Sequence, residues 1–253
     1  MNRIIALWCH PRSMSTAIER IMRERGDCSC FHEPFMYDYY IHRGVRAMPH
    51  FDVEPDRPVA YAEIRNHLLE AAESATVFIK DMSYYVVPAL FDDTAFAQRL
   101  THAFLIRHPA RSILSYHRLD PDLTLEEIGL EAQWRHYEWL QYNLGMDPVV
   151  LEAEAIRQDP EAAMRTFWTA VGLSFAGHAL AWQDDRTPED WGQVAGWHGA
   201  VSGSTSIKPA VHDGEENLSS EFAAAVAQAP HLEAFLAHHL PFYERLRAKA
   251  SSA

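Results

Sequence analysis

Cysteine is scarce in this sequence. The 253 residues include only Cys9, Cys28 and Cys30. So small and odd a number excludes a disulfide framework and favours reduced thiols in the cytoplasm. Cys28, Cys30 and His32 alternate along one short segment, which leaves a metal site open. Small buried thiols on one strand face are the commoner explanation, because zinc sites draw four ligands mostly from turns and loops, and we therefore expect no metal.

Long hydrophobic runs are also missing. The first apolar run, Ile4–Cys9, is too short for a signal peptide, and no segment has the length needed to cross a bilayer. Apolar residues nevertheless make up 48% of the chain, which is enough for a packed core. We expect one cytoplasmic domain over residues 1–253, without a membrane partner.

Positive charge is in short supply. The chain has 22 Lys and Arg residues against 35 Asp and Glu residues, a formal net charge of −13. Proteins that bind nucleic acids or anionic membranes need a positive field to offset phosphates, so neither partner is expected. A polyanionic substrate is disfavoured for the same reason, and a small molecule is the expected substrate. The oligomeric state does not follow from the sequence.

Short apolar segments alternate with amphipathic ones along most of the chain. The predicted strands are Ile4–Trp8, Cys28–His32, Thr76–Ile79, His102–Ile106 and Val149–Leu151. The predicted helices are Ser15–Arg25, Ala62–Ala72, Ala110–Arg118, Leu125–Asn143 and Glu161–Val171. This alternation predicts an α/β fold of three layers, α/β/α, with a central parallel sheet. Ligands of such sheets bind at the carboxyl ends of the strands.

Residues 182–218 break this pattern. They are rich in glycine and proline but carry Trp182, Trp191 and Trp197. A segment of this kind is typical of a lid or a loop on the substrate side. Helix is predicted to resume near Ser219 and to be broken at Pro230 and Pro241.

The segment after the first strand has the residues of an anion site. It contains Pro11, Arg12, Ser13, Met14, Ser15 and Thr16. A helix that begins here presents free backbone N–H groups beside a guanidinium and three hydroxyls. The glycines and lysine of a Walker motif are missing, so the loop is P-loop-like only in its position. A plain helix cap is the alternative.

This loop resembles the Pro-[Lys/Arg]-Ser-Gly-[Ser/Thr]-[Ser/Thr] loop of the sulfotransferase superfamily, which binds the 5′-phosphosulfate of 3′-phosphoadenosine-5′-phosphosulfate. Met14 stands where that family has glycine. We expect either a different turn at this position or a methionine side chain that walls the acceptor pocket.

A second motif strengthens the resemblance. Arg107, after the fourth strand, and Ser115, eight residues later, are similar to the family's Arg-x-Pro-(x)5-Ser element. In the family this pair grips the 3′-phosphate of the nucleotide. The late sequence around Ser204 and Lys208 occupies the place of the family's loop over that phosphate, although an ordinary surface loop explains it equally well.

The catalytic residues follow from the same resemblance. Lys80 matches the lysine that approaches the bridging oxygen of the donor, but Met82 replaces the histidine that serves as base. Branches of the superfamily with a glutamate base resemble this chain at Glu33, and His32 and Asp81 are reserve candidates. The resemblance implies that Arg12 and Lys80 stabilise charge on the leaving 5′-phosphate while Glu33 takes the acceptor proton.

We therefore predict a sulfotransferase that moves a sulfuryl group from the nucleotide donor to a hydroxyl or amine of a small acceptor. One alternative is a nucleotide-dependent kinase in which Ser15 or Thr16 and Asp81 hold Mg²⁺. The other is a catalytically idle nucleotide-binding module, which Met82 supports.

Overall fold

The structure is a computed structural model that describes residues 2–183, 188–197, 203–207 and 215–250. Its strands are β1 (Ile4–Cys9), β2 (Ser29–His32), β3 (Val77–Met82), β4 (Leu100–Ile106) and β5 (Val149–Glu152). The first half of the chain carries α1 (Ser15–Glu24), η1 (Asp38–His42), α2 (Tyr61–Ser74), α3 (Ser83–Asp92), α4 (Thr94–Ala97), α5 (Pro109–His117) and η2 (Glu126–Ile128). The second half carries α6 (Leu130–Leu144), α7 (Ala153–Gln158), α8 (Pro160–Ala170), η3 (Gly177–Leu180), η4 (Glu189–Trp197), α10 (Glu215–Gln228) and α11 (His231–Arg247).

The five strands form one parallel sheet, as the sequence predicts. Their order is β2-β3-β1-β4-β5, and every neighbouring pair is parallel. All residues of β1 and β3 are buried, because helices cover both faces of the central part of the sheet. The carboxyl ends of β1, β3 and β4 therefore meet at one edge, where the sequence motifs also lie.

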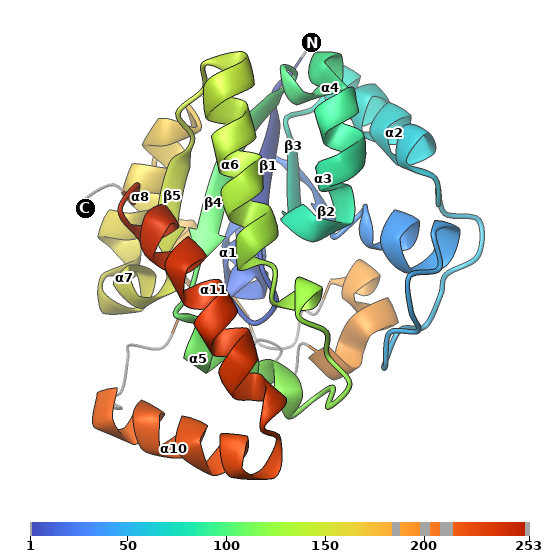
Figure 1. Cartoon of the computed structure of the whole chain (residues 1–253). Coiled ribbons are helices and arrows are strands. Elements are labelled where there is room, and N and C mark those ends of the chain that lie inside the picture. The colour runs from blue at the N-terminus through green and yellow to red at the C-terminus, as the bar shows by residue number, and fades with distance from the viewer. Residues whose placement is uncertain (1, 184–187, 198–202, 208–214, 251–253) are drawn as a thin grey trace.

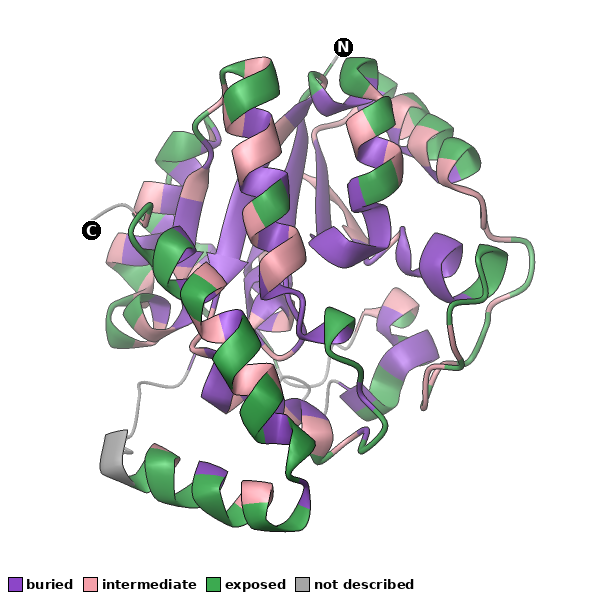
Figure 2. Ribbon diagram, viewed as in Figure 1, coloured by how far each residue is buried: buried purple, intermediate pink, exposed green. Residues whose placement is uncertain are grey.

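Helices flank the sheet on both sides. Helices α6 and α11 cross in front of it and α1 lies behind it (Figure 1). The strands form the most buried layer, while α10 is mostly exposed (Figure 2). This arrangement is the predicted three-layer α/β/α fold.

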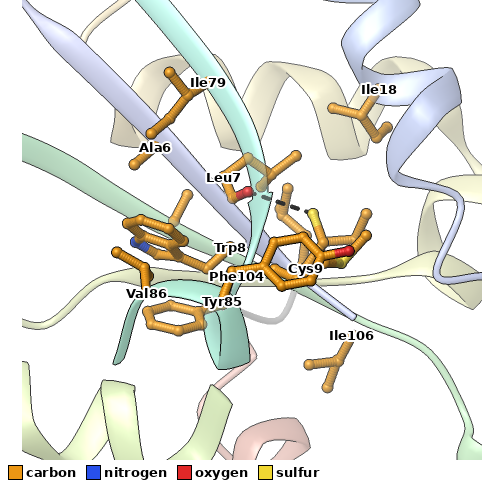
Figure 3. Close-up of a cluster of buried hydrophobic side chains, with 14 of the residues drawn as sticks. Ala6, Leu7, Trp8, Cys9, Ile18, Ile79, Tyr85, Val86, Phe104 and Ile106 are labelled. Atoms are coloured by element: carbon orange, nitrogen blue, oxygen red, sulfur yellow. Dashed lines mark hydrogen bonds between the residues drawn. The ribbon is translucent and has the colours of Figure 1, made fainter. Parts of the chain in front are cut away.

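The core packs around the tryptophan of the first strand. Trp8 lies among Leu7, Tyr85, Val86 and Phe104 (Figure 3). Its indole Nε1 donates a hydrogen bond of 2.8 Å to Nδ1 of His102, so the one polar group of this large side chain is satisfied inside the core.

Two local predictions are wrong, and helix α3 was not predicted. The predicted helix Leu125–Asn143 is divided at Gly129, whose φ of +82° favours glycine and where a Cβ atom would lie only 3.0 Å from Cβ of His10. Helix α11 continues through Pro241, since burial of Tyr243 and Leu246 outweighs one lost backbone hydrogen bond. Helix α3 has no helical pattern in its sequence, and six of its ten residues are buried, five of them in its first turn and a half.

The segment predicted as a lid is packed on the protein where the structure describes it. Trp182, Trp191 and Trp197 are all buried. Ala181, just before the segment, pairs with Ser206 in an isolated antiparallel bridge, which ties the start of the segment to its described stretch 203–207. Residues 184–187, 198–202 and 208–214 lie outside the described part, and Lys208 is among them.

Candidate active site

A cavity of about 180 Å³ lies at the carboxyl edge of the sheet. Its lining combines the first-strand loop, the strand ends and two segments from farther along the chain. The lining residues are Pro11, Arg12, Met14, Ser15, Thr16, Glu33, Met48, Met82, Tyr85, Arg107, Val194 and Trp197. Seven of the residues predicted for the site are therefore brought to one cavity, namely Pro11, Arg12, Met14, Ser15, Thr16, Glu33 and Arg107.

The loop after β1 has an unusual backbone. Arg12 and Met14 have φ values of +63° and +76°, in the left-handed region that glycine adopts most easily. Each such residue costs about 1–2 kcal/mol. Met14 thus takes the conformation natural to the glycine of the resembling loop, and its side chain lines the cavity.

Arg12 and Arg107 are the cationic residues of the cavity lining, and Ser115, which does not line the cavity, bonds to Arg12. Arg12 Nε donates to Ser115 Oγ at 3.0 Å, and Arg107 Nη1 donates to the carbonyl oxygen of Arg12 at 2.8 Å. Burial lowers the pKa of Arg107 to about 10 and also lowers that of Arg12, yet both remain cations at neutral pH. Partly desolvated guanidinium groups this close together form a strong site for an anion.

The remaining loop residue, Ser13, is fully buried. Its Oγ has no hydrogen-bond partner among the described residues. Buried hydroxyls are normally paired, so Ser13 Oγ is an exception, and Ser13 is not among the residues that line the cavity.

Glu33 also lines the cavity and forms an ion pair with Lys80. Lys80 Nζ donates to Glu33 Oε1, and the hydroxyl of Tyr85 lies 3.5 Å from Glu33 Oε2. Glu33 lines the cavity from a backbone with φ +43°, while Lys80 is fully buried behind it. Burial alone would lower the pKa of Lys80, but the charges of Glu33 and Glu19 outweigh it and the pKa is raised. Lys80 is therefore held as a cation beside a carboxylate that reaches the cavity.

The two reserve candidates for the base do not line the cavity. His32 Nδ1 is paired with Glu19 Oε2 at 2.5 Å, and its Nε2 lies 3.8 Å from Glu33 Oε1. Asp81 accepts the backbone N–H groups of Phe35 and Met82 at 2.8 and 2.9 Å. Burial raises the pKa of Asp81 well above its ordinary value. Both side chains thus have partners that hold them in place below the site.

Two further predictions differ from the structure in detail. Lys80 is not the last residue of its strand, because β3 continues to Met82. Ser204 is buried and is not among the residues that line the cavity. The backbone carbonyl of its neighbour Thr205 accepts the N–H of Trp182 at 2.8 Å.

Sequence reasoning missed several residues of the site. Met48, Tyr85 and Val194 line the cavity from segments without a motif. Glu19 is fully buried beneath it, and its spacing of four from Ser15 is the one available signal, since that spacing places both on one face of α1.

The described residues contain no group of three or more His, Cys, Asp or Glu side chains that could hold a metal ion. Cys9, Cys28 and Cys30 are free thiols, and burial raises the pKa of Cys28 to about 11. None of the helices in the described ranges combines the length and the apolar character needed to span a membrane.

Comparison with known proteins agrees with this geometry. The sequence profile of the sulfotransferase domain matches residues 2–250. The branched-chain-amino-acid aminotransferase-like proteins 2 and 1 of Arabidopsis thaliana are each 24% identical over 206 residues, which make up 81% of this chain. The chain spans about a third of these relatives, since the match covers 36% of each plant protein.

Two solved structures share the fold. The sulfotransferase domain from the curacin biosynthetic pathway matches with a TM-score of 0.59 at 14% identity, over 91% of this chain and 98% of that one. The sulfotransferase domain from the Synechococcus PCC 7002 olefin synthase matches with a TM-score of 0.57 at 16% identity, over 89% and 94% of the two chains. With a family profile that extends over nearly all of its residues and a fold shared with these domains, the chain belongs to the sulfotransferase domain family.

Proposed function

We propose that this protein transfers a sulfuryl group from 3′-phosphoadenosine-5′-phosphosulfate to a hydroxyl or amine of a small acceptor. The observation that carries the proposal is one cavity whose lining includes the guanidinium groups of Arg12 and Arg107 and the carboxylate of Glu33. The guanidinium groups suit a nucleotide with two separate phosphates, and the carboxylate suits removal of a proton. Family membership supports the same activity.

The donor fits the residues of the loop. Arg12 lines the cavity, and the backbone N–H groups at the start of α1 favour an anion. We assign the 5′-phosphosulfate to residues 11–16 and the 3′-phosphate to Arg107 and Ser115. The donor supplies the activated sulfuryl group together with a good leaving group, the 5′-phosphate.

The chain's own residues then have distinct tasks. Glu33 removes the proton of the acceptor oxygen or nitrogen as that atom bonds to sulfur. Arg12 stabilises the negative charge that develops on the 5′-phosphate as its bond to sulfur breaks. Lys80 remains a cation throughout and orients Glu33.

The acceptor side of the cavity is apolar. Met14, Met48, Met82, Val194 and Trp197 contribute most of its walls, and flexible methionine side chains adapt to different shapes. We infer a small, uncharged acceptor, in agreement with the net charge of −13. We further propose that residues 1–253 form one domain that acts in the cytoplasm, where its free thiols remain reduced.

The kinase alternative is weakened by Asp81, whose carboxylate is committed to two backbone N–H groups inside the protein. The idle-module alternative loses its main support, because Glu33 supplies a proton acceptor in the cavity despite Met82.

Calorimetry tests the nucleotide assignment. We expect 3′-phosphoadenosine-5′-phosphate to bind without Mg²⁺ and more tightly than either ATP or adenosine-5′-phosphosulfate. Transfer of radioactive sulfate from the donor to a panel of small alcohols and amines then tests the activity. Tighter, Mg²⁺-dependent binding of ATP would contradict the proposal.

A further inference from the structure

Glu19 is a buried carboxylate with three polar partners. It lies on α1 and is fully buried. Its Oε1 accepts hydrogen bonds from Trp191 Nε1 at 2.9 Å and from Arg23 Nη2 at 2.7 Å, and its Oε2 lies 2.5 Å from His32 Nδ1. Removing a carboxylate from water costs several kcal/mol, and a buried carboxylate therefore needs several partners to stay ionised.

Glu19 also faces the catalytic ion pair. Its Oε2 is 3.9 Å from Lys80 Nζ, which is itself fully buried and bonded to Glu33. When Glu33 takes up a proton it loses its charge. Without a second carboxylate, Lys80 would then be an uncompensated buried cation. Glu19 supplies that second carboxylate in every stage of the reaction.

His32 bridges the two carboxylates. Parallel pairing of β2 with β3 sets His32 directly beside Lys80. The contact of Nδ1 with Glu19 fixes the orientation of the ring, and Nε2 then lies 3.8 Å from Glu33 Oε1. The position of Glu33 thus depends on Glu19 along two routes, one through His32 and one through Lys80.

Glu19 is also linked, through its hydrogen bond with Trp191, to the wall of the acceptor pocket. Trp191 belongs to η4, which also carries Val194 and Trp197 into the cavity. A second tie runs from Arg23, which bonds both Glu19 and Asp190 of η4, the latter at 2.6 Å.

We propose that Glu19 is a positioning residue of the transfer reaction, whose carboxylate orients Lys80 and His32 behind Glu33 and couples them through Trp191 to the acceptor wall. The part of this proposal that concerns sulfuryl transfer rests on the proposed function. The contacts that link Glu19 to His32, Lys80 and Trp191 rest on the geometry alone. Burial by itself would raise the pKa of Glu19, but the nearby charges of His32, Lys80 and Arg23 outweigh it and the pKa is lowered.

The test compares Glu19→Gln with the control Glu24→Gln. Glu24 lies on the same helix and pairs with Arg20 at 2.8 Å, but it is partly exposed and away from the ion pair. We expect Glu19→Gln to lower kcat by about 10²-fold, the loss that follows when a reacting group is displaced by about 1 Å, with little change in affinity for 3′-phosphoadenosine-5′-phosphate. Glu24→Gln should leave both unchanged.

A spectroscopic measurement is independent of activity. In nitrogen-15 and proton NMR spectra of the whole chain, the His32 Nδ1–H resonance should lie far downfield, because a carboxylate accepts its hydrogen bond. It should move upfield in Glu19→Gln and stay in place in Glu24→Gln. A wild-type protein with this resonance but without transfer activity would overturn the proposed function and leave the coupling intact.

Two further variants keep the proposal testable if Glu19→Gln unfolds. Glu19→Asp restores the charge and should recover part of the lost turnover. Trp191→Phe keeps an aromatic side chain but removes the N–H donor, and should both shift the His32 resonance and lower kcat. Full turnover in a folded Glu19→Gln protein, or an unmoved His32 resonance in both Glu19→Gln and Trp191→Phe, would overturn the proposal.

Discussion

Arg12 and Ser115 are hydrogen-bonded side chain to side chain at 3.0 Å, although 103 residues separate them in sequence. The sequence motifs suggested two separate anion sites, one on the loop after β1 and one at the start of α5. The hydrogen bond makes them neighbours in one site. Arg107 extends this site by donating to the backbone of Arg12.

Replacing Arg107 with alanine should weaken binding of 3′-phosphoadenosine-5′-phosphate. A charged group that hydrogen-bonds a phosphate contributes about 1.5–3 kcal/mol, so calorimetry should show the loss of that much binding free energy. The preference over adenosine-5′-phosphosulfate should disappear, and Ser115→Ala should cost less. Arg118→Ala, which replaces an exposed arginine at the end of α5, serves as the control. An unchanged preference in Arg107→Ala would move the 3′-phosphate to other residues.

Replacing Lys80 with methionine should lower turnover more than donor affinity. Lys80 is buried behind Glu33 and does not line the cavity, so its loss displaces the carboxylate without removing a contact to the nucleotide. We expect kcat to fall by about 10²-fold or more, the range for removing one preorganised electrostatic contact. The control is Lys249→Met, which replaces an exposed lysine. If the Lys80→Met variant bound the donor more weakly but kept a normal kcat, Lys80 would be a binding residue.

Mild acid should destabilise the fold through His102. Burial lowers the pKa of this ring from 6.5 to about 4, so the unfolded chain binds more protons than the folded protein between those pH values. The stabilising contribution is complete above pH 6.5 and is lost as the pH falls toward 4. For this one group the loss reaches about 3 kcal/mol.

Urea unfolding at pH 7.5 and pH 5 measures this effect. The His102→Gln variant keeps an acceptor for Trp8 Nε1 and a donor for the carbonyl of Ala97, but it does not titrate. Its free energy of unfolding should depend less on pH than that of the wild type. Equal pH dependence in the two proteins would assign the acid sensitivity to other groups.

The sequence predicts the sheet well because each strand is a short apolar run between polar residues, as in Ile4–Cys9. It also predicts which loop residues gather at the carboxyl edge, since parallel strands bring their ends together. The division at Gly129 and the helix of residues 83–92 depend on tertiary packing and have no local signal.

The candidate site was predictable where a motif exists and not elsewhere. The motifs that follow the strands contain Arg12, Glu33 and Arg107. Glu19 looks like an ordinary polar residue of an amphipathic helix, and its burial becomes visible only when β2 and η4 are packed against α1.

The central claim is that Glu33 removes the acceptor proton, and the Glu33→Gln variant tests it most directly. Glutamine keeps the shape of the side chain and cannot accept a proton at neutral pH. Turnover at saturating donor and acceptor should fall by about 10²–10⁴-fold, the usual contribution of a positioned base. Affinity for 3′-phosphoadenosine-5′-phosphate should stay near that of the wild type.

His32→Asn and Asp81→Asn, measured in parallel, examine the two reserve candidates, and the melting temperature of each variant shows whether it is folded. The account predicts the deepest loss of kcat in Glu33→Gln. Near-full turnover in Glu33→Gln, with a folded but inactive His32→Asn or Asp81→Asn protein, would contradict it.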